Sequence, residues 1–149
     1  MKEIKVAENK TLKLTNVLSR EIHPEEMASL PVVLTQMHNF IKSNNAQPIG
    51  PIVQAMVVGE DRQMHLYMMQ QATQLIPRME AGYSMDAVLR VRNCLYAHYT
   101  GPMSHNQLAT AKLQIMAFEN DIKLTGDNYT IYVNQDEDDA VVDVFMETK

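Results

Sequence analysis

The sequence contains one cysteine, Cys94, and no tryptophan. A single thiol cannot form an internal disulfide, so the fold depends on its hydrophobic core. No apolar run approaches the roughly 18 residues that a membrane-spanning helix needs, and the N-terminus lacks the apolar core of a signal peptide. The net charge of −5 argues against nucleic acid as a direct partner, because phosphates are bound by a basic face. We therefore expect a cytoplasmic protein that contacts neither nucleic acid nor a membrane.

Motifs for metals and cofactors are also missing. The five histidines show no metal-ligand spacing, and no glycine-rich phosphate loop is present. Cys94 and His98 share one face of a predicted strand, but four residues of strand separate them by about 13 Å. That distance is too long for a nucleophile and its base. We expect no metal site, no cofactor and no cysteine-based catalysis.

The chain consists of two similar halves. Gly50 and Gly126 each follow a helix-like stretch, and they lie 76 residues apart. The same offset aligns residues 51–57 with 127–133 and residues 65–71 with 141–147. A repeated unit that cannot bury its apolar face alone packs against its copy. The sequence predicts one domain over residues 1–149, built from half-repeats 1–76 and 83–149 with a short linker at 77–82. The seam between the halves is a natural place for a ligand cleft.

The first half has the order strand, helix, strand, strand. Residues 11–20 alternate around Leu12 and Leu14, as a strand does. Residues 52–58 and 64–73 are predicted as two strands of a hairpin that turns at 59–61. Between these segments, apolar side chains recur with helical spacing at Leu30, Val33, Leu34, Met37 and Ile41.

The second half repeats this order. Residues 87–92 and 94–100 are strand-like, and the last strands, 129–133 and 141–148, flank an acidic loop at 135–139. The helix between them is predicted to have Ser104 as its N-cap. Its predicted inward stripe consists of Leu108, Ala111, Ile115 and Phe118. The fold class is α+β: a tandem pseudo-two-fold repeat of two strand–helix–strand–strand units, with an antiparallel sheet and two main helices.

Several short motifs of the second half resemble a known family. Residues 97–102 (AHYTGP), an amphipathic helix, Gly126, residues 128–132 (NYTIY) and a final strand are similar to the GyrI-like small-molecule-binding domain. That domain also serves as the effector-binding module of AraC- and MerR-type transcription regulators. The resemblance covers essentially the whole chain and implies a tandem of two strand–helix–strand–strand units with a small-molecule cleft.

The family's binding acid is a glutamate in the last strand, in a pattern like Glu-Ile-Tyr-Ile-Pro-Val. The resemblance places Asp143 at that position and Phe145 at the aromatic position, with Glu147 two residues further on. The acid is shorter by one methylene, and the aromatic lacks a hydroxyl. Met103 stands where the family often has an aromatic after glycine-proline. These departures leave the type of ligand open.

Asp143 is the leading candidate for a binding residue. On a strand its side chain shares a face with Phe145 and Glu147, among apolar neighbours. A carboxylate in apolar company has a raised pKa unless a positive charge pairs with it. A cationic ligand supplies that charge, and an aromatic wall adds cation–π attraction. The alternative is an exposed edge strand on which Asp143 and Glu147 are both solvated.

Further ligand-binding candidates follow from the repeat and from strand alternation. Tyr67 occupies the position of Asp143 in the first half, and Met69 lies two residues beyond it. Tyr96 and His98 share one face of a second-half strand. Tyr132 is a further candidate, and its alternative is a core tyrosine with a satisfied hydroxyl.

These observations favour a stand-alone small-molecule-binding protein. It takes apolar, cationic or aromatic compounds between its halves, in sensing or sequestration, and the short segment before the first strand leaves no room for a helix-turn-helix. One alternative is inhibition of a protein partner through the acidic loop 136–139, as the gyrase-inhibitor members of the family imply. The other is a hydrolase of strained electrophiles, with Asp143 as general base and Tyr67 or Tyr132 as acid. Binding without catalysis is the preferred hypothesis.

Overall fold

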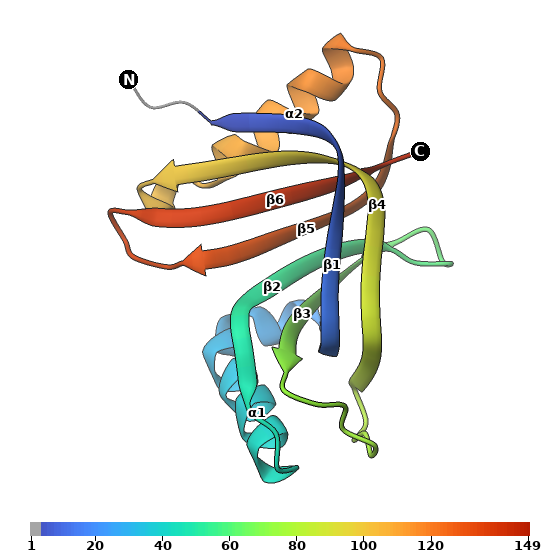
Figure 1. The fold of residues 1–149 in the computed structure, drawn as a ribbon, viewed down its shortest axis with the longest axis vertical. Helices are drawn as coiled ribbons and strands as arrows, with labels where there is room; N and C mark the ends of the chain where they lie inside the picture. The colour runs from blue at the N-terminus through green and yellow to red at the C-terminus, as the bar shows by residue number, and fades with distance from the viewer. Residues whose placement is uncertain (1–3) are drawn as a thin grey trace.

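The computed structural model describes residues 4–149. Two helices lie at opposite ends of one twisted sheet, α2 beside one half and α1 beside the other (Figure 1). The elements in chain order are β1 (Lys5–Ile22), the short 3-10 helix η1 (Pro24–Ser29), α1 (Leu30–Ser43), β2 (Pro48–Val58), β3 (Met64–Ala72), β4 (Tyr83–Gly101), the 3-10 turn η2 (Met103–His105), α2 (Gln107–Glu119), β5 (Leu124–Asn134) and β6 (Ala140–Thr148).

The sheet closes into a barrel in the order β1-β3-β2-β5-β6-β4, and all neighbouring strands run antiparallel. The two halves join along two seams. Lys13 pairs with Arg90 where β1 meets β4, and Gln54 pairs with Thr130 where β2 meets β5. The predicted fold class, α+β with an antiparallel sheet and two main helices, is confirmed.

The repeat is visible in the element boundaries. Strands β5 and β6 begin and end 76 residues after β2 and β3. Asn45 and Asp121, just beyond the two helices, both have positive φ, and so do Gly50 (φ 73°) and Gly126 (φ 101°). Both glycines lie inside a strand, β2 or β5, where the register of the ladder shifts. Glycine adopts such left-handed positions with little strain, which explains why it occupies both irregularities. Each half therefore leaves its helix and enters its second strand through the same pattern of positive-φ residues.

Three apolar clusters hold the structure together. One lies between α1 and the first half and contains Met37 and Ile41. Another lies between α2 and the second half and contains Leu113. The third fills the space inside the sheet between the halves and includes Leu14 and Tyr129. Burial raises the pKa of Tyr129 to about 12. Because the helices cover the outer faces, functional side chains that point inward lie on the opposite face of the sheet from both helices.

The predicted inward stripe of α2 is wrong. The helix buries Ala109, Leu113 and Ala117 instead. Phe118 is 85% exposed and Ile115 is 58% exposed. Small alanines one turn apart on either side of a leucine let the helix lie close to the sheet, and the bulky residues are rotated outward. Ser104 is not the N-cap either, because it lies in η2 and α2 begins at Gln107.

The first strand of each half is longer than predicted. Strand β1 extends over Lys5–Ile22, and β4 runs without interruption over Tyr83–Gly101. The predicted break within β4 falls at Asn93, which has φ 57°. The register of β1 and β4 shifts in this region, so an irregularity within the ladder accommodates the residue. Long paired strands are required here because they form one of the two seams.

Candidate functional site

The inward face of the second half carries a carboxylate with two polar partners. Asp143 on β6 lies opposite His98 on β4 in the strand register. Its Oδ1 atom is 2.6 Å from His98 Nδ1 and accepts a hydrogen bond of 2.7 Å from the Tyr96 hydroxyl. The side chain of Asp143 is 21% exposed and that of His98 is 37% exposed. The carboxylate is thus half-buried yet reachable from solvent.

An aromatic pair stands beside this carboxylate. Tyr96 lies opposite Phe145 in the register, and the two ring centroids are 5.0 Å apart with the planes tilted by 48°. Burial raises the pKa of Tyr96, and the hydrogen bond to Asp143 raises it further. Tyr96 therefore keeps its proton at neutral pH, and its hydroxyl donates a hydrogen bond to Asp143. The structure brings Asp143, His98, Tyr96 and Phe145 together.

Glu147 lies farther along the same face of β6, opposite Cys94. Its side chain is partly exposed, whereas Cys94 is fully buried. Burial raises the pKa of the Cys94 thiol to about 11, and the Glu147 charge contributes to that rise. Cys94 is therefore a core residue and an unreactive thiol. Glu147 belongs to the edge of the group around Asp143 and has no direct contact with it among the hydrogen bonds of residues 4–149.

Tyr132 is separated from this group by the sheet. It packs into the apolar cluster beneath α2, and its hydroxyl donates a hydrogen bond of 3.2 Å to Gln54 Oε1. Burial raises its pKa. The hydroxyl is satisfied on the outer face of the sheet, so Tyr132 is a core tyrosine and does not line the inward face with Asp143.

The first half places Tyr67 and Met69 at the equivalent positions. Tyr67 lies opposite Glu21 in the register of β1 and β3, as Asp143 lies opposite His98 in the second half. The Tyr67 hydroxyl is 3.5 Å from Glu21 Oε1. Burial is the main cause that raises the pKa of Tyr67, and the nearby Glu21 charge is the next. Met69 is buried in the cluster between the halves. Tyr67 thus borders an acidic group, and Met69 serves the core.

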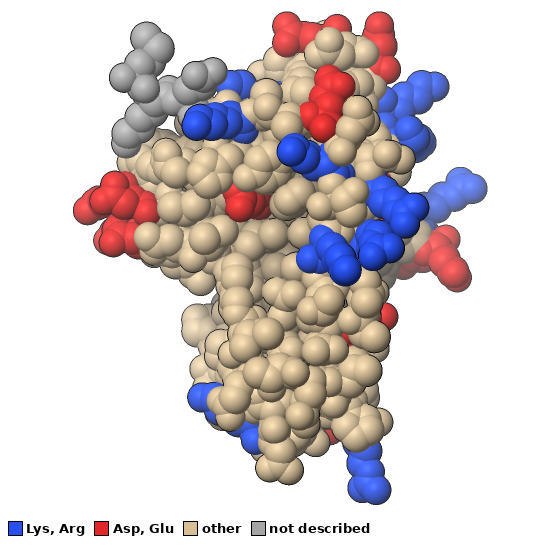
Figure 2. Space-filling model, viewed as in Figure 1, with Lys and Arg blue, Asp and Glu red and all other residues tan. Residues whose placement is uncertain are grey.

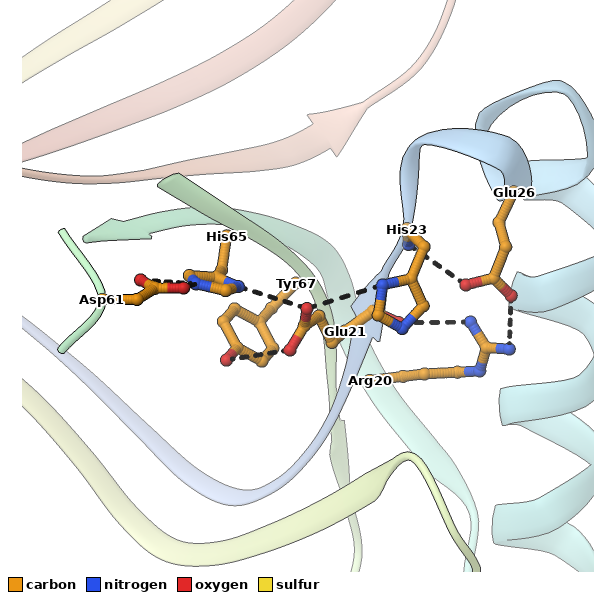
Figure 3. A network of polar contacts seen from close by, with 7 residues as sticks. All are labelled: Arg20, Glu21, His23, Glu26, Asp61, His65 and Tyr67. Carbon is orange, nitrogen blue, oxygen red and sulfur yellow. Dashed lines mark hydrogen bonds and ion pairs between the residues drawn. The ribbon is translucent and has the colours of Figure 1, made fainter. Parts of the chain in front are cut away.

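Glu21 was not predicted from the sequence, although it lies at the centre of a polar network in the first half (Figure 3). Its Oε2 atom is 3.2 Å from His65 Nδ1, and the other ring nitrogen of His65 is 2.9 Å from Asp61 Oδ2. Beside it, Arg20 forms an ion pair of 2.7 Å with Glu26. The 76-residue offset pairs Glu21 with Ala97. Its equivalence to His98, 77 residues further on, appears only in the strand register, so the sequence repeat does not reveal it.

A groove of about 510 Å³ runs beside this network. Glu21, Asp61 and His65 contribute polar atoms to its wall. Its apolar lining includes three methionines, Met27, Met56 and Met64. Thioethers on unbranched stems adapt to apolar partners of different shape. The first half therefore offers a second place where acidic and apolar groups meet.

His65 is expected to make stability depend on pH. The hydrogen bond to Asp61, followed by the one to Glu21, raises the pKa of His65 above 6.5. A raised folded-state pKa stabilises the protein fully below about pH 6.5, and the contribution disappears as the pH rises through the raised value.

The measurement is the melting temperature of wild type and His65→Gln between about pH 5 and about pH 9. The advantage of wild type should shrink as the pH rises. His105→Gln is the matched control, because His105 is exposed in the other half. An advantage of wild type over His65→Gln that stays constant with pH would contradict the assignment.

The acidic loop 135–139 is exposed, and its charges gather at the end of β5 and β6, on the left in Figure 2. Part of this acidity has a local role. Asp136 Oδ1 accepts hydrogen bonds from the backbone N–H groups of Asp138 and Asp139. Basic side chains gather instead over β1 and β4 in the same view. Within residues 4–149, no three His, Cys, Asp or Glu side chains are grouped to hold a metal ion, and no helix is long and apolar enough to cross a membrane.

Comparison with known proteins shows a shared fold. No family model matches the sequence, and no curated protein matches it. Among solved structures, EcmrR in a complex with DNA is similar with a TM-score of 0.74 and 13% identity, over 98% of this chain and 57% of EcmrR. The separate C-terminal domain of EcmrR is similar with a TM-score of 0.61 and 11% identity, over 99% of this chain and 97% of that domain. The chain thus spans little more than half of EcmrR.

SAV2435, solved with bound tetraphenylphosphonium, is similar with a TM-score of 0.55 and 13% identity, over 99% of this chain and 94% of SAV2435. The chain has a GyrI-like fold. The resemblance predicted from the second-half motifs is therefore confirmed at the level of the fold. In this chain the two helices cover the outer face of the sheet. Asp143, the acid of the last strand, points to the opposite, inward face.

Proposed function

We propose that this protein binds small apolar cations on the inward face of its second half. Asp143 would take the positive charge, and Tyr96 and Phe145 would contact the apolar part of the ligand. The observation that carries the proposal is the half-buried Asp143 carboxylate beside an aromatic pair. Its partners within residues 4–149 are a tyrosine hydroxyl and a histidine, and neither carries a permanent positive charge. A cation completes this environment because it pairs with the carboxylate and attracts the aromatic faces.

The shared fold supports the same ligand class. Tetraphenylphosphonium, which is bound in the structure of SAV2435, has a permanent positive charge inside an apolar shell. Such an ion cannot donate a hydrogen bond, so its recognition rests on a carboxylate and on aromatic contact. We infer that the present chain acts in sensing or in sequestration of compounds of this kind. EcmrR binds DNA as a longer chain, and control of a DNA-binding partner is the corresponding proposal for a sensing role.

Thermal stabilisation by tetraphenylphosphonium tests the proposal. At 100 times its dissociation constant a ligand stabilises the folded protein by about 2.7 kcal/mol, which corresponds to about 5–10 °C for a chain of this size. The shift should disappear in Asp143→Asn and persist in Glu147→Gln, the matched control on the same strand face. Triphenylphosphine oxide, which is neutral, should give a much smaller shift with wild type.

Other results would move the cation site away from Asp143 or remove it. A shift that survives Asp143→Asn but disappears in Glu21→Gln would place the cation in the methionine-lined groove of the first half. A shift that survives both substitutions would remove the carboxylates as anchors. No shift with any cation would overturn the proposed cation binding, and no shift with neutral aromatic compounds either would favour a protein partner for the acidic loop.

Hydrolysis is the second candidate function, because Asp143 is held by a tyrosine and a histidine as a general base would be. Tyr96 hydrogen-bonds to Asp143, whereas Tyr67 and Tyr132, the expected partners, lie elsewhere. The raised pKa of Tyr96 makes it a weak proton donor, which favours binding over hydrolysis. Turnover of a strained epoxide by wild type that is lost in Asp143→Asn would reverse this preference.

A further inference from the structure

The outward face of α2 is apolar where a solvent-facing helix is normally polar. Leu108, Ile115 and Phe118 lie on this face and are 49%, 58% and 85% exposed. Their spacing of seven and three residues forms a stripe along the helix, with Ala111 between them. Phe118 is the most exposed of the large apolar side chains in the described structure. An exposed stripe of this kind marks an interaction site.

The outward face of α1, the equivalent helix of the first half, carries polar residues where α2 has Ile115 and Phe118. By the 76-residue offset, Ile115 corresponds to Asn39 and Phe118 corresponds to Lys42. Both α1 residues are polar and exposed. The two helices occupy equivalent places on equivalent sheets, so the difference is not imposed by packing within the chain. The apolar residues of α2 are an addition that the fold itself does not need.

A hollow of about 400 Å³ lies beside the stripe. Its wall contains Val6, Ile115 and Met116, together with Lys112 and Glu119. The Phe118 ring protrudes from the stripe, and the apolar side chains of the hollow form a recess that can accept such a ring. Lys112 and Glu119 have opposite charges and lie seven residues apart on one side of the helix. An antiparallel α2 from a second copy would place Lys112 of each chain opposite Glu119 of the other, which gives two ion pairs.

We propose that α2 is the interface of a homodimer, in which two copies pair their α2 helices antiparallel about a two-fold axis. Phe118 of each copy occupies the hollow of the other. Such an isologous contact uses the same patch twice and closes on itself. A helix of 13 residues is about 20 Å long, which limits the contact to the small end of stable interfaces. We therefore expect a weak dimer, with a dissociation constant on the order of micromolar. Asp143 points to the opposite face of the sheet, so the dimer leaves the proposed ligand site free.

Sedimentation equilibrium from about 1 to about 200 µM tests the dimer, because this range spans micromolar dissociation constants. The mass of wild type should rise with concentration from 17.0 kDa toward twice that value. Ile115→Asn and Phe118→Lys copy the residues of α1 and should remain monomeric throughout. Val32→Asn is the matched control, because Val32 is an exposed apolar residue at the equivalent of Leu108 on α1, and it should dimerise as wild type does.

A charge exchange provides an independent test. Lys112→Glu and Glu119→Lys should each weaken the dimer at least tenfold, and the double variant should recover most of the loss. Circular dichroism and melting temperature check that the single variants fold, which matters for Lys112 because its Nζ atom donates a hydrogen bond to the Ile4 carbonyl. A wild-type mass of 17.0 kDa at every concentration, or a Phe118→Lys variant that still dimerises, would overturn the proposal.

Discussion

Replacing Leu113 by alanine is expected to lower the free energy of unfolding by about 2–5 kcal/mol. Leu113 is fully buried between α2 and the sheet. Its loss removes apolar burial and leaves a cavity that the alanines on either side cannot fill. Urea denaturation at low protein concentration, where a second copy contributes nothing, measures the change. The corresponding fall in melting temperature is about 4–20 °C.

Ile115→Ala is the matched control. It removes a side chain of similar size from the same helix, two residues further on, where it is exposed. At low protein concentration the loss should stay within about 0.5 kcal/mol. A larger loss for Ile115→Ala than for Leu113→Ala would mean that α2 faces the sheet with the stripe that the sequence pattern predicts.

Gly126→Ala is expected to destabilise the protein by about 2–4 kcal/mol. Gly126 has φ 101°, a conformation that side chains with a Cβ rarely adopt. A Cβ atom added there would also lie 2.8 Å from Val58 Cγ2, across the seam between β5 and β2. Both costs arise at the register shift near the start of β5. Chemical denaturation of the variant measures their sum.

Gly82→Ala separates the two costs. Gly82 has φ 90°, yet a Cβ atom there would meet no other atom within 4 Å. Only the conformational cost remains, and a loss of about 1–2 kcal/mol is expected. Equal losses in the two variants would show that Val58 moves aside freely and that the close approach across the seam has no energetic role.

The duplicated layout could be predicted because it depends on sequence features that act over a few residues. The 76-residue offset, the glycines at Gly50 and Gly126 and the periodicity of the segment around Met37 each act within a few residues of chain. Strand alternation placed Asp143 and Phe145 on one face by the same local logic. The structure agrees with that placement and brings Tyr96 and His98, two further candidates from the sequence, beside Asp143. Whether these residues bind a ligand is a question for the tetraphenylphosphonium experiment.

The orientation of α2 could not be predicted in this way. Its sequence has two apolar stripes, a bulky one at Ile115 and Phe118 and a small one at Ala109 and Ala117 with Leu113 between them. Hydrophobicity alone favours the bulky stripe. Close packing of the helix on the sheet favours the small one, and that preference depends on the shape of the sheet surface. The proposed dimer uses the stripe that the sheet leaves exposed.

Covalent spacing and backbone geometry account for the repeat, the strand–helix–strand–strand order and the side of each strand on which a residue falls. These features could therefore be predicted from the chain alone. The pairs of residues that meet across strands appear only in the folded protein. Glu21 meets Asp61 and His65 from a distant part of the chain, and Tyr132 and Asp143 lie on opposite sides of the same sheet. Such encounters depend on strand register and closure, and these are set by the packing of the whole core rather than by any single segment.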